Sequence, residues 1–285
     1  MAVEPPRWFR EIEAALGSRP VSRTPLSGGS IAHVDKIGLA DGRIVVAKTG
    51  ARGLALEAEM LTFLADRSDL PVPRVLLSGD DLLVMECLPG TTRLDPPSET
   101  HAAELLAALH ERRADRFGFH RDTVIGGVPQ PNPWNDNWIP FFRDHRLLHM
   151  ARDCQAAGSL PTAMLHRLER FATKLDALLE EPDFPSLVHG DMWSGNILSD
   201  GGRITGFLDP AVYYGHAEIE LAFSTLFGTI GDAFFERYHA LRPISPGFFE
   251  IRKDIYNLWH LLTHVRLFGA SYLGGVERVL ARHGV

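Results

Sequence analysis

Two aspartates and an asparagine in the second half of the chain have the spacing that phosphoryl transfer requires. The tripeptide His-Gly-Asp ends at Asp191, Asn196 follows five residues later, and Asp209 closes an apolar run. Phosphoryl transfer needs a carboxylate that orients the attacking hydroxyl and oxygen ligands for magnesium. The pattern therefore predicts Asp191 as the catalytic base and Asn196 and Asp209 as Mg²⁺ ligands. His-Gly-Asp alone fits an ordinary turn equally well, but the joint pattern favours a catalytic loop.

A lysine near the N-terminus is a candidate for binding the phosphates of ATP. Lys48 is one of four lysines in the chain and follows the apolar residues 44–47. Kinases hold the α- and β-phosphates with a lysine in this position on a strand. The alternative is a lysine that extends from a strand end into solvent. Glu57 or Glu59 on the following helix could pair with Lys48; we prefer Glu57, although both would also suit a solvated helix face.

A short glycine-containing segment lies between two runs with β-strand character. It consists of Ser27, Gly28, Gly29 and Ser30. Backbone N–H groups in such a loop could cover phosphate oxygens, so we assign Gly28, Gly29 and Ser30 to ATP binding. Taken alone the signal is weak, because most Gly-Gly pairs form turns.

The first third of the chain has the pattern of a small antiparallel sheet with one helix. An Asp-Gly pair at 41–42 between two β-rich runs predicts a hairpin, and apolar residues at helical spacing predict a helix over 54–64. Pro89-Gly90 marks a hinge. The predicted strands cover 31–37, 43–48, 74–77 and 82–86.

Beyond residue 98 the pattern is mainly helical. The predicted helices cover 99–112, 138–156, 161–180 and 251–282, and two short strands at 196–198 and 203–208 interrupt them. Together the elements predict an α+β, bilobal, protein-kinase-like fold. Residues 1–88 would form a small N-lobe with an antiparallel sheet, and residues 89–285 a larger helical C-lobe.

Composition limits the class of partner. The net charge of −7 argues against a nucleic acid or an anionic membrane as a partner, whereas ATP arrives with its own metal ions. The two cysteines form no Cys-x-x-Cys pair, and neither a leader pattern nor a long apolar run occurs. These features predict a cytoplasmic protein that acts on a small molecule; they leave the oligomeric state open.

The catalytic segment resembles the fructosamine kinase (ketosamine kinase) family within the protein-kinase-like superfamily. Residues 189–196 read HGDMWSGN and residues 209–215 read DPAVYYG, close to the family's HGDLWSGN and DPAxYYG. Segments at 117–142 are similar to the family's insert ahead of the catalytic loop, and those at 256–269 to its C-terminal signature. The resemblance covers nearly the whole chain.

The resemblance implies ATP and Mg²⁺ as cofactors and a sugar joined to an amine as the substrate. It implies that Lys48 and Glu57 anchor the phosphates and that the backbone from Glu86 to Leu88 contacts adenine. Trp193 is similar to a residue lining the family's sugar site, although it would equally suit a packing role.

A cationic amine on the substrate calls for acidic or polar groups near the sugar site. We therefore expect Asp136 and Asn137 from the insert, and Glu218 after YYG, to contact the substrate. Two departures from the family pattern lie close by: His216 replaces an acidic residue, and Glu220 replaces an aspartate that braces the catalytic loop.

Other functions are compatible with the same residues. An aminoglycoside or choline kinase would share the catalytic residues, and a nucleotide-binding pseudokinase would share the fold. A protein kinase is disfavoured because Gly190 occupies the position of the arginine that reads a phosphorylated activation loop.

Overall fold

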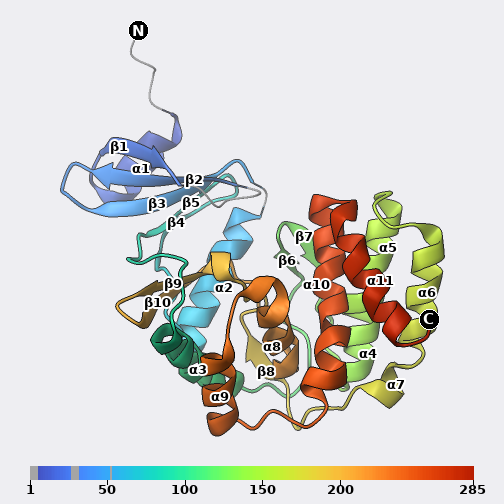
Figure 1. Cartoon of the computed structure of the whole chain (residues 1–285). Coiled ribbons are helices and arrows are strands. Elements are labelled where there is room, and N and C mark those ends of the chain that lie inside the picture. Colours follow the sequence, from blue (N-terminus) through green and yellow to red (C-terminus); the bar gives the residue numbers. More distant parts are fainter. Residues whose placement is uncertain (1–5, 27–31, 52) are drawn as a thin grey trace.

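Five antiparallel strands form the N-terminal sheet of the computed structural model, which describes residues 6–26, 32–51 and 53–285 (Figure 1). Their order across the sheet is β1-β2-β3-β5-β4. The strands are β1 (Pro20–Pro25), β2 (His33–Leu39), β3 (Ile44–Thr49), β4 (Val75–Ser78) and β5 (Leu82–Glu86). The Asp-Gly turn joins β2 to β3 as predicted, and Gly42 adopts a φ of 89°, which favours glycine because it has no Cβ.

Two helices accompany this sheet. α1 (Trp8–Leu16) places the buried Ile12 in a small apolar cluster with residues of β2, β3 and β5. α2 (Leu54–Arg67) packs Leu54, Ala58 and Leu61 against Leu83 and Met85 of β5. Since α2 begins shortly after β3, its first turn lies beside the end of the strand that carries the lysine.

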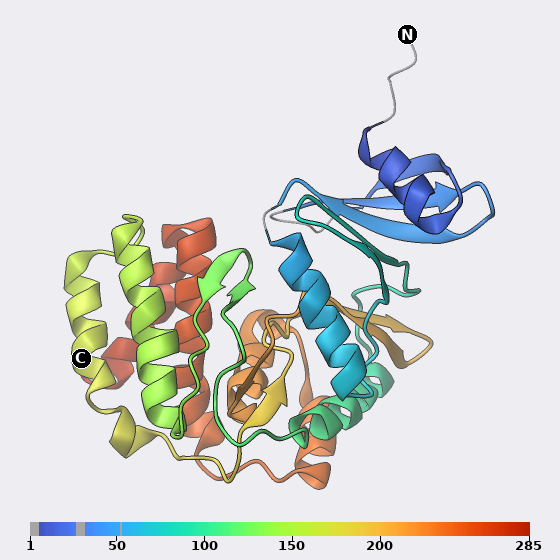
Figure 2. The same ribbon diagram turned by 180° about the vertical axis from the view of Figure 1, so that it is seen from behind.

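The rest of the chain is mostly helical (Figure 2). The helices are α3 (Pro96–His110), α4 (Trp138–Phe142), α5 (Leu148–Ala156), α6 (Thr162–Ala172), α7 (Leu175–Leu178), α8 (Ala217–Thr225), α9 (Asp232–Leu241), α10 (Lys253–Phe268) and α11 (Leu273–Arg282). Three two-stranded ladders join them: β6 (Thr123–Ile125) with β7 (Val128–Gln130), β8 (Ser186–Val188) with β11 (Tyr213–Gly215), and β9 (Ile197–Asp200) with β10 (Arg203–Phe207).

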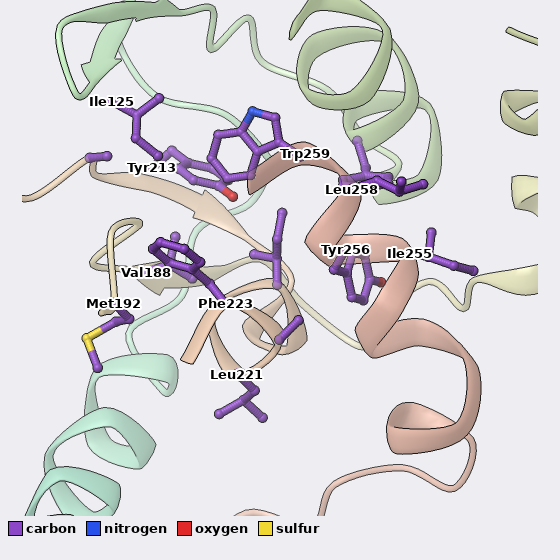
Figure 3. Close-up of a cluster of buried hydrophobic side chains, with 14 of the residues drawn as sticks. Ile125, Val188, Met192, Tyr213, Leu221, Phe223, Ile255, Tyr256, Leu258 and Trp259 are labelled. Atoms are coloured by element: carbon purple, nitrogen blue, oxygen red, sulfur yellow. The ribbon is translucent and has the colours of Figure 1, made fainter. Parts of the chain in front are cut away.

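The main core lies between α8, α10 and the β8–β11 ladder. Val188, Tyr213, Phe223 and Trp259 are all buried there (Figure 3). This core supports the loops that leave β8 and precede β11, and these loops carry the catalytic motif. In the part of the chain that the structure describes, no helix is both long and apolar enough to span a bilayer.

The α+β fold with its antiparallel N-terminal sheet agrees with the prediction, whereas several long helices were predicted without their interruptions. The helix expected over 138–156 contains a π-helical turn at Arg143–Leu147. The helix expected over 251–282 begins with a second π-helical turn, Phe248–Arg252, and breaks at Gly269, which has a φ of 89°. The helix expected over 161–180 divides into α6 and α7.

Several short elements were missed: α1, β1, β6, β7, β8, β11, α8 and α9. Strands of three residues, such as β6 and β7, are too short for alternation to be read from a sequence. α8 is buried on nearly all sides, and its buried residues include Glu218 and Glu220, so it lacks the one-sided apolar pattern of a surface helix. The division into lobes at residue 88 stays a prediction.

Candidate active site

The catalytic loop leaves β8 through a backbone conformation that only glycine adopts readily. Gly190 has a φ of 88°, and a Cβ on it would lie 2.1 Å from the carbonyl oxygen of Ala211. This close approach fixes the path of the chain into Asp191. The side-chain amide of Asn196 then donates to the backbone oxygen and to the carboxylate of Asp191, both at 2.9 Å. The base candidate and the metal-ligand candidate therefore form one hydrogen-bonded unit.

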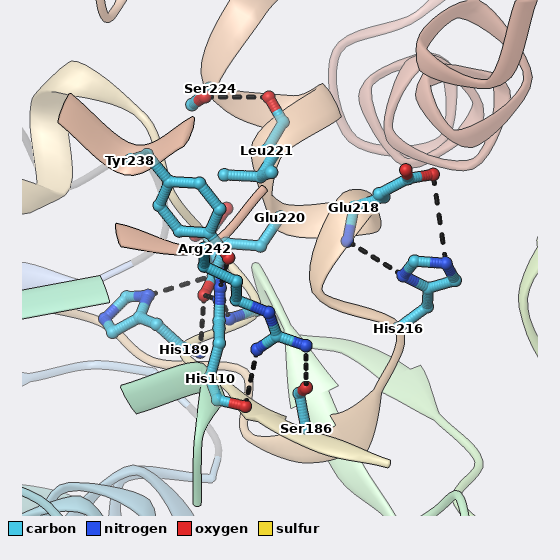
Figure 4. Close-up of polar contacts among 12 residues, drawn as sticks. His110, Ser186, His189, His216, Glu218, Glu220, Leu221, Ser224, Tyr238 and Arg242 are labelled. Carbon is cyan, nitrogen blue, oxygen red and sulfur yellow. Dashed lines mark hydrogen bonds and ion pairs between the residues drawn. The ribbon is translucent and has the colours of Figure 1, made fainter. Parts of the chain in front are cut away.

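A buried carboxylate from α8 holds the backbone of this loop. Glu220 accepts hydrogen bonds from the N–H of Gly190 at 2.6 Å and of His189 at 3.2 Å, and contacts Nε2 of His110 at 2.9 Å (Figure 4). Nδ1 of His110 in turn lies 2.6 Å from the Tyr238 hydroxyl. Burial alone would raise the pKa of Glu220, but the hydrogen bond and charge of His110 outweigh it and lower the pKa. The side chain of Glu220 thus reaches both backbone amides of the catalytic loop.

The β9–β10 hairpin brings Asp209 back beside the loop. The N–H of Leu208 donates to the backbone oxygen of Asn196 at 2.9 Å, and Asp209 adopts a positive φ of 53°. Such a conformation is uncommon for a residue other than glycine and is characteristic of functional sites. Asp209 contacts the Nζ of Lys48, which also donates to Glu57 at 2.6 Å.

Glu57, rather than Glu59, is therefore the partner of Lys48. Glu59 points to another part of the molecule, where it contacts Nε2 of His120 at 3.0 Å and accepts from Arg121 at 2.6 Å. The two glutamates are two positions apart on α2 and so face different directions, as helix geometry requires.

Two pKa shifts mark the site as electrostatically unusual. Burial and the negative charge of Asp209 raise the pKa of Asp191 to about 8, against a smaller opposing effect of its hydrogen bond from Asn196. Burial lowers the pKa of Lys48, but the carboxylates of Asp209 and Glu57 more than compensate, so the net shift is upward. Lys48 is therefore a cation throughout the physiological range, available to bind an anionic ligand.

These groups line one cleft. It encloses about 1090 Å³ between its walls, part of it open to solvent. Lys48, Glu57, Asp191, Asn196 and Asp209 all lie on its wall. Trp193 also lines the cleft, half-buried, with its ring close over the backbone of residue 195.

Three residues expected at the substrate do not line the cleft. Glu218 is 5% exposed and forms two hydrogen bonds of 2.7 Å with the guanidinium of Arg252. A buried carboxylate in such a pair is not available to a substrate, so that assignment is corrected. Asp136 and Asn137 are exposed, and Asp136 accepts a 2.7 Å hydrogen bond from Arg116. Both residues directly precede α4, which begins at Trp138, and the chain exposes them to solvent there.

The other residues expected to bind the nucleotide, Glu86 and Leu88, do not line the cleft with their side chains. Glu86 ends β5 and donates its N–H to the Arg74 carbonyl at 2.9 Å, and Leu88 packs against Gly206. Neither side chain lines the described cleft, which leaves their backbone groups as the contacts to consider. Gly28, Gly29 and Ser30 lie outside the described residues.

The far wall of the cleft consists of residues that were not predicted as site residues. They come from α8 and α10, and most are aromatic or histidine: Phe223, His260, Thr263, His264, Leu267 and Phe268. The His260 ring stacks on Phe223 at 3.9 Å with an interplanar angle of 6°. The family-like signature at 256–269 contained this signal, but only its position across the cleft gives it a function.

The donor set fits magnesium held partly by phosphates. Asn196 uses its NH₂ group on Asp191, which leaves the amide oxygen for a cation, and Asp209 supplies a carboxylate. Within residues 6–26, 32–51 and 53–285, no group of three or more His, Cys, Asp or Glu side chains is placed to hold a metal. Two protein ligands suit Mg²⁺, because it retains waters and takes phosphate oxygens from the nucleotide.

Fold and cleft together define a phosphotransferase of the kinase-like superfamily that has an alcohol group as acceptor. A model of the family described as Fructosamine kinase matches residues 9–283. The chain belongs to the fructosamine kinase family, whose members use ATP.

Individual relatives agree with this membership. The chain is 39% identical over 241 residues to a Synechocystis protein named "Probable ketoamine kinase", covering 81% of this chain and 76% of that protein. It is 34% identical over 296 residues to a rice protein, Oryza sativa subsp. japonica, named "Protein-ribulosamine 3-kinase, chloroplastic", covering 94% and 84%.

Solved structures show the same fold. A Thermobifida fusca protein described as a candidate fructosamine-3-kinase superposes with a TM-score of 0.86 at 28% identity, covering 97% of this chain and 99% of that one. The aminoglycoside phosphotransferase APH(4)-Ia superposes with a TM-score of 0.70 at 18% identity, covering 97% of each chain. At this identity the comparison shows a similar fold and no more.

Proposed function

We propose that this chain transfers the γ-phosphoryl group of ATP to the 3-hydroxyl of a ketosamine, a ketose joined to an amine. This proposal rests on one observation: a single cleft with a mainly aromatic far wall contains Lys48, Glu57, Asp191, Asn196 and Asp209. The names of relatives, ketoamine kinase and ribulosamine 3-kinase, support the acceptor class and the position of the hydroxyl.

Each residue has a distinct task in this proposal. Asp191 accepts the proton of the attacking hydroxyl, since its carboxylate lies on the wall of the cleft and is held by the side-chain amide of Asn196. Lys48, held by Glu57, neutralises charge on the α- and β-phosphates. Asn196 and Asp209 would hold Mg²⁺, which supplies further neutralisation of the phosphate charge when bound.

Adenine would lie at the backbone between Glu86 and Leu88. Among the described residues, the Leu88 N–H has no backbone partner, so it is free to donate to a ring nitrogen. We assign the phosphate-covering loop to Gly28, Gly29 and Ser30 from the sequence alone, because these residues come between β1 and β2 in the chain and β2 pairs with the strand of Lys48.

We propose the cytoplasm, a reducing compartment, as the site of action. Both cysteines are free, and burial raises the pKa of the Cys154 thiol to about 11, which keeps it protonated and unreactive.

The decisive test is phosphorylation of an N-alkyl ribulosamine by the full chain with Mg·ATP. We expect transfer to the ketosamine to exceed transfer to an aminoglycoside or to choline. Asp191→Asn should lower kcat by on the order of 10²-fold or more while leaving Mg·ATP affinity nearly unchanged. Asp200→Asn, at the exposed end of β9, is the matched control and should retain activity. Faster turnover of choline or an aminoglycoside than of every ketosamine would overturn the substrate assignment.

A further inference from the structure

An aromatic rim adjoins the cleft through Phe268, which lies on its far wall. We define it as Phe227, Phe268 and Tyr272. Phe268 lines the cleft, and its ring centroid lies 6.2 Å from that of Tyr272. Phe227 lies 6.2 Å from Tyr272 on the other side, and both Phe227 and Phe268 contact the His264 ring, at 4.9 and 5.5 Å.

Two members of the rim are exposed although they are large and apolar. Phe227 is 50% exposed and Phe268 is 48% exposed. Phe227 also has a φ of 63°, a left-handed conformation that costs of order 1–3 kcal/mol for a bulky residue. Neither its exposure nor its backbone is explained by core packing, so the position of this ring calls for another cause.

The rim is attached to the catalytic loop. The N–H of Ser194 donates to the Thr229 hydroxyl at 3.3 Å, and Thr229 donates in turn to the Leu226 carbonyl at 3.2 Å. The segment that presents Phe227 is thus fixed to the residue following Trp193. Asp191, Trp193 and Phe268 all line the same cleft, so a ligand with its hydroxyl at Asp191 can reach the rim within that cleft.

No acidic side chain that lines the cleft in the described part of the chain is available to bind the substrate's amine near the rim. Among the described residues that line the cleft, the carboxylates are Glu57, Asp191 and Asp209. Glu57 and Asp209 both contact Lys48, and Asp191 accepts from Asn196. Glu57 and Asp209 are therefore engaged with the phosphate-binding lysine, and Asp191 serves the attacking hydroxyl. The acidic side chains expected to meet the amine lie outside the cleft.

Aromatic faces offer the alternative. The negative face of an aromatic ring attracts an ammonium group, and the attraction grows as the cation is desolvated. Burial lowers the pKa of His264, against the opposing effect of its hydrogen bond to the His260 carbonyl. The imidazole between the two phenylalanines is therefore neutral at pH 7 and does not repel a cation.

We propose that the rim of Phe227, Phe268 and Tyr272 is the amine subsite of this kinase and binds the substrate's secondary ammonium and the first carbons of its substituent through aromatic faces. The inference rests on the proposed function and names how the acceptor is selected. Because Phe227 and Phe268 are both about half exposed, the substituent beyond those first carbons extends into solvent. Acceptors are then selected for a cation next to the sugar and not for the identity of the amine.

The test compares two acceptors of equal shape in the full chain with Mg·ATP. One is an N-butyl ribulosamine, which is cationic, and the other is the 1-O-butyl ether of ribulose, which is neutral. The wild type should phosphorylate the amine with a kcat/KM about tenfold or more above that of the ether. Phe268→Leu and Phe227→Leu keep apolar surface but remove the ring, and each should reduce this preference by roughly three- to tenfold, mainly through KM.

Phe249→Leu is the matched control, because Phe249 is 45% exposed and contacts Phe235 and Phe248 away from the cleft. It should leave the preference unchanged. Equal losses for amine and ether in the rim variants would show that the rim supplies apolar surface only, which overturns the proposal. A wild-type preference retained in both variants would also overturn it, with the kinase function intact. Failure of the wild type to phosphorylate either acceptor would instead refute the proposed function.

Discussion

Acidification should destabilise the folded protein through His216, the residue that begins α8. Its Nδ1 accepts a hydrogen bond from the Glu218 N–H at 3.1 Å, a capping contact that requires the neutral ring. Burial, with the charges of Arg252 and Arg242, lowers the pKa of His216 from 6.5 to about 3. Its side chain is 13% exposed, so solvent screens this effect little.

The sign of the effect follows from proton uptake. Between pH 6.5 and about 3, His216 is protonated in the unfolded chain but not in the folded one. The unfolded state then binds one more proton, so the free energy of unfolding falls as the pH falls. At ~1.4 kcal/mol per pH unit, lowering the pH from about 7 to about 4.5 should remove ~2.5 kcal/mol through this residue.

Urea unfolding at several pH values measures this contribution. His216→Asn keeps a capping acceptor but cannot titrate, so its free energy of unfolding should lose ~2.5 kcal/mol less than the wild type over that interval. His166→Asn, at an exposed position in α6, is the matched control and should follow the wild type. A constant difference between His216→Asn and wild type at every pH would refute the reasoning.

Three further outcomes test the site. Asp209→Ala should abolish magnesium-dependent ATP binding in calorimetric titration and Asn196→Ala should weaken it, whereas unchanged affinity in Asp209→Ala would place the metal elsewhere. Glu220→Gln presents an amide N–H₂ to a backbone donor and should cost ~2–4 kcal/mol in urea unfolding and lower kcat; wild-type stability would contradict the bracing role. Glu59→Arg should lower kcat by releasing α2 from the insert, and adding Arg121→Glu should restore part of it; a double variant no better than the single one would argue against the contact.

A buried arginine holds the insert ahead of the catalytic loop. Arg146 is completely buried and donates to the Pro131 carbonyl at 2.7 Å and to the Asn132 side chain at 2.6 Å. Its guanidinium also lies 4.0 Å from the Tyr213 ring centroid. In the sequence Arg146 is one of many arginines. Its stabilising contacts arise only when folding removes it from water and places it against residues that are distant in the chain.

Local patterns were sufficient for the catalytic loop and its hairpin. Asp191 and Asn196 are five residues apart, and one turn and a short ladder return the chain to Asp209. The Asp-Gly hairpin before Lys48 was equally accessible, since turn type is set by adjacent residues. Such features depend on backbone preferences over a few residues, so the sequence alone determined them, together with the α+β class.

Long-range packing decided the remainder. Lys48 and Asp209 are 161 positions apart, and only the juxtaposition of sheet and helices brings them into contact. Glu218 and Glu220 are two positions apart on α8, yet one pairs with Arg252 and the other braces the catalytic loop. Whether a carboxylate meets substrate, cation or backbone depends on which groups share its buried surroundings. That is a property of the folded core, and the sequence states it only through the whole set of tertiary contacts.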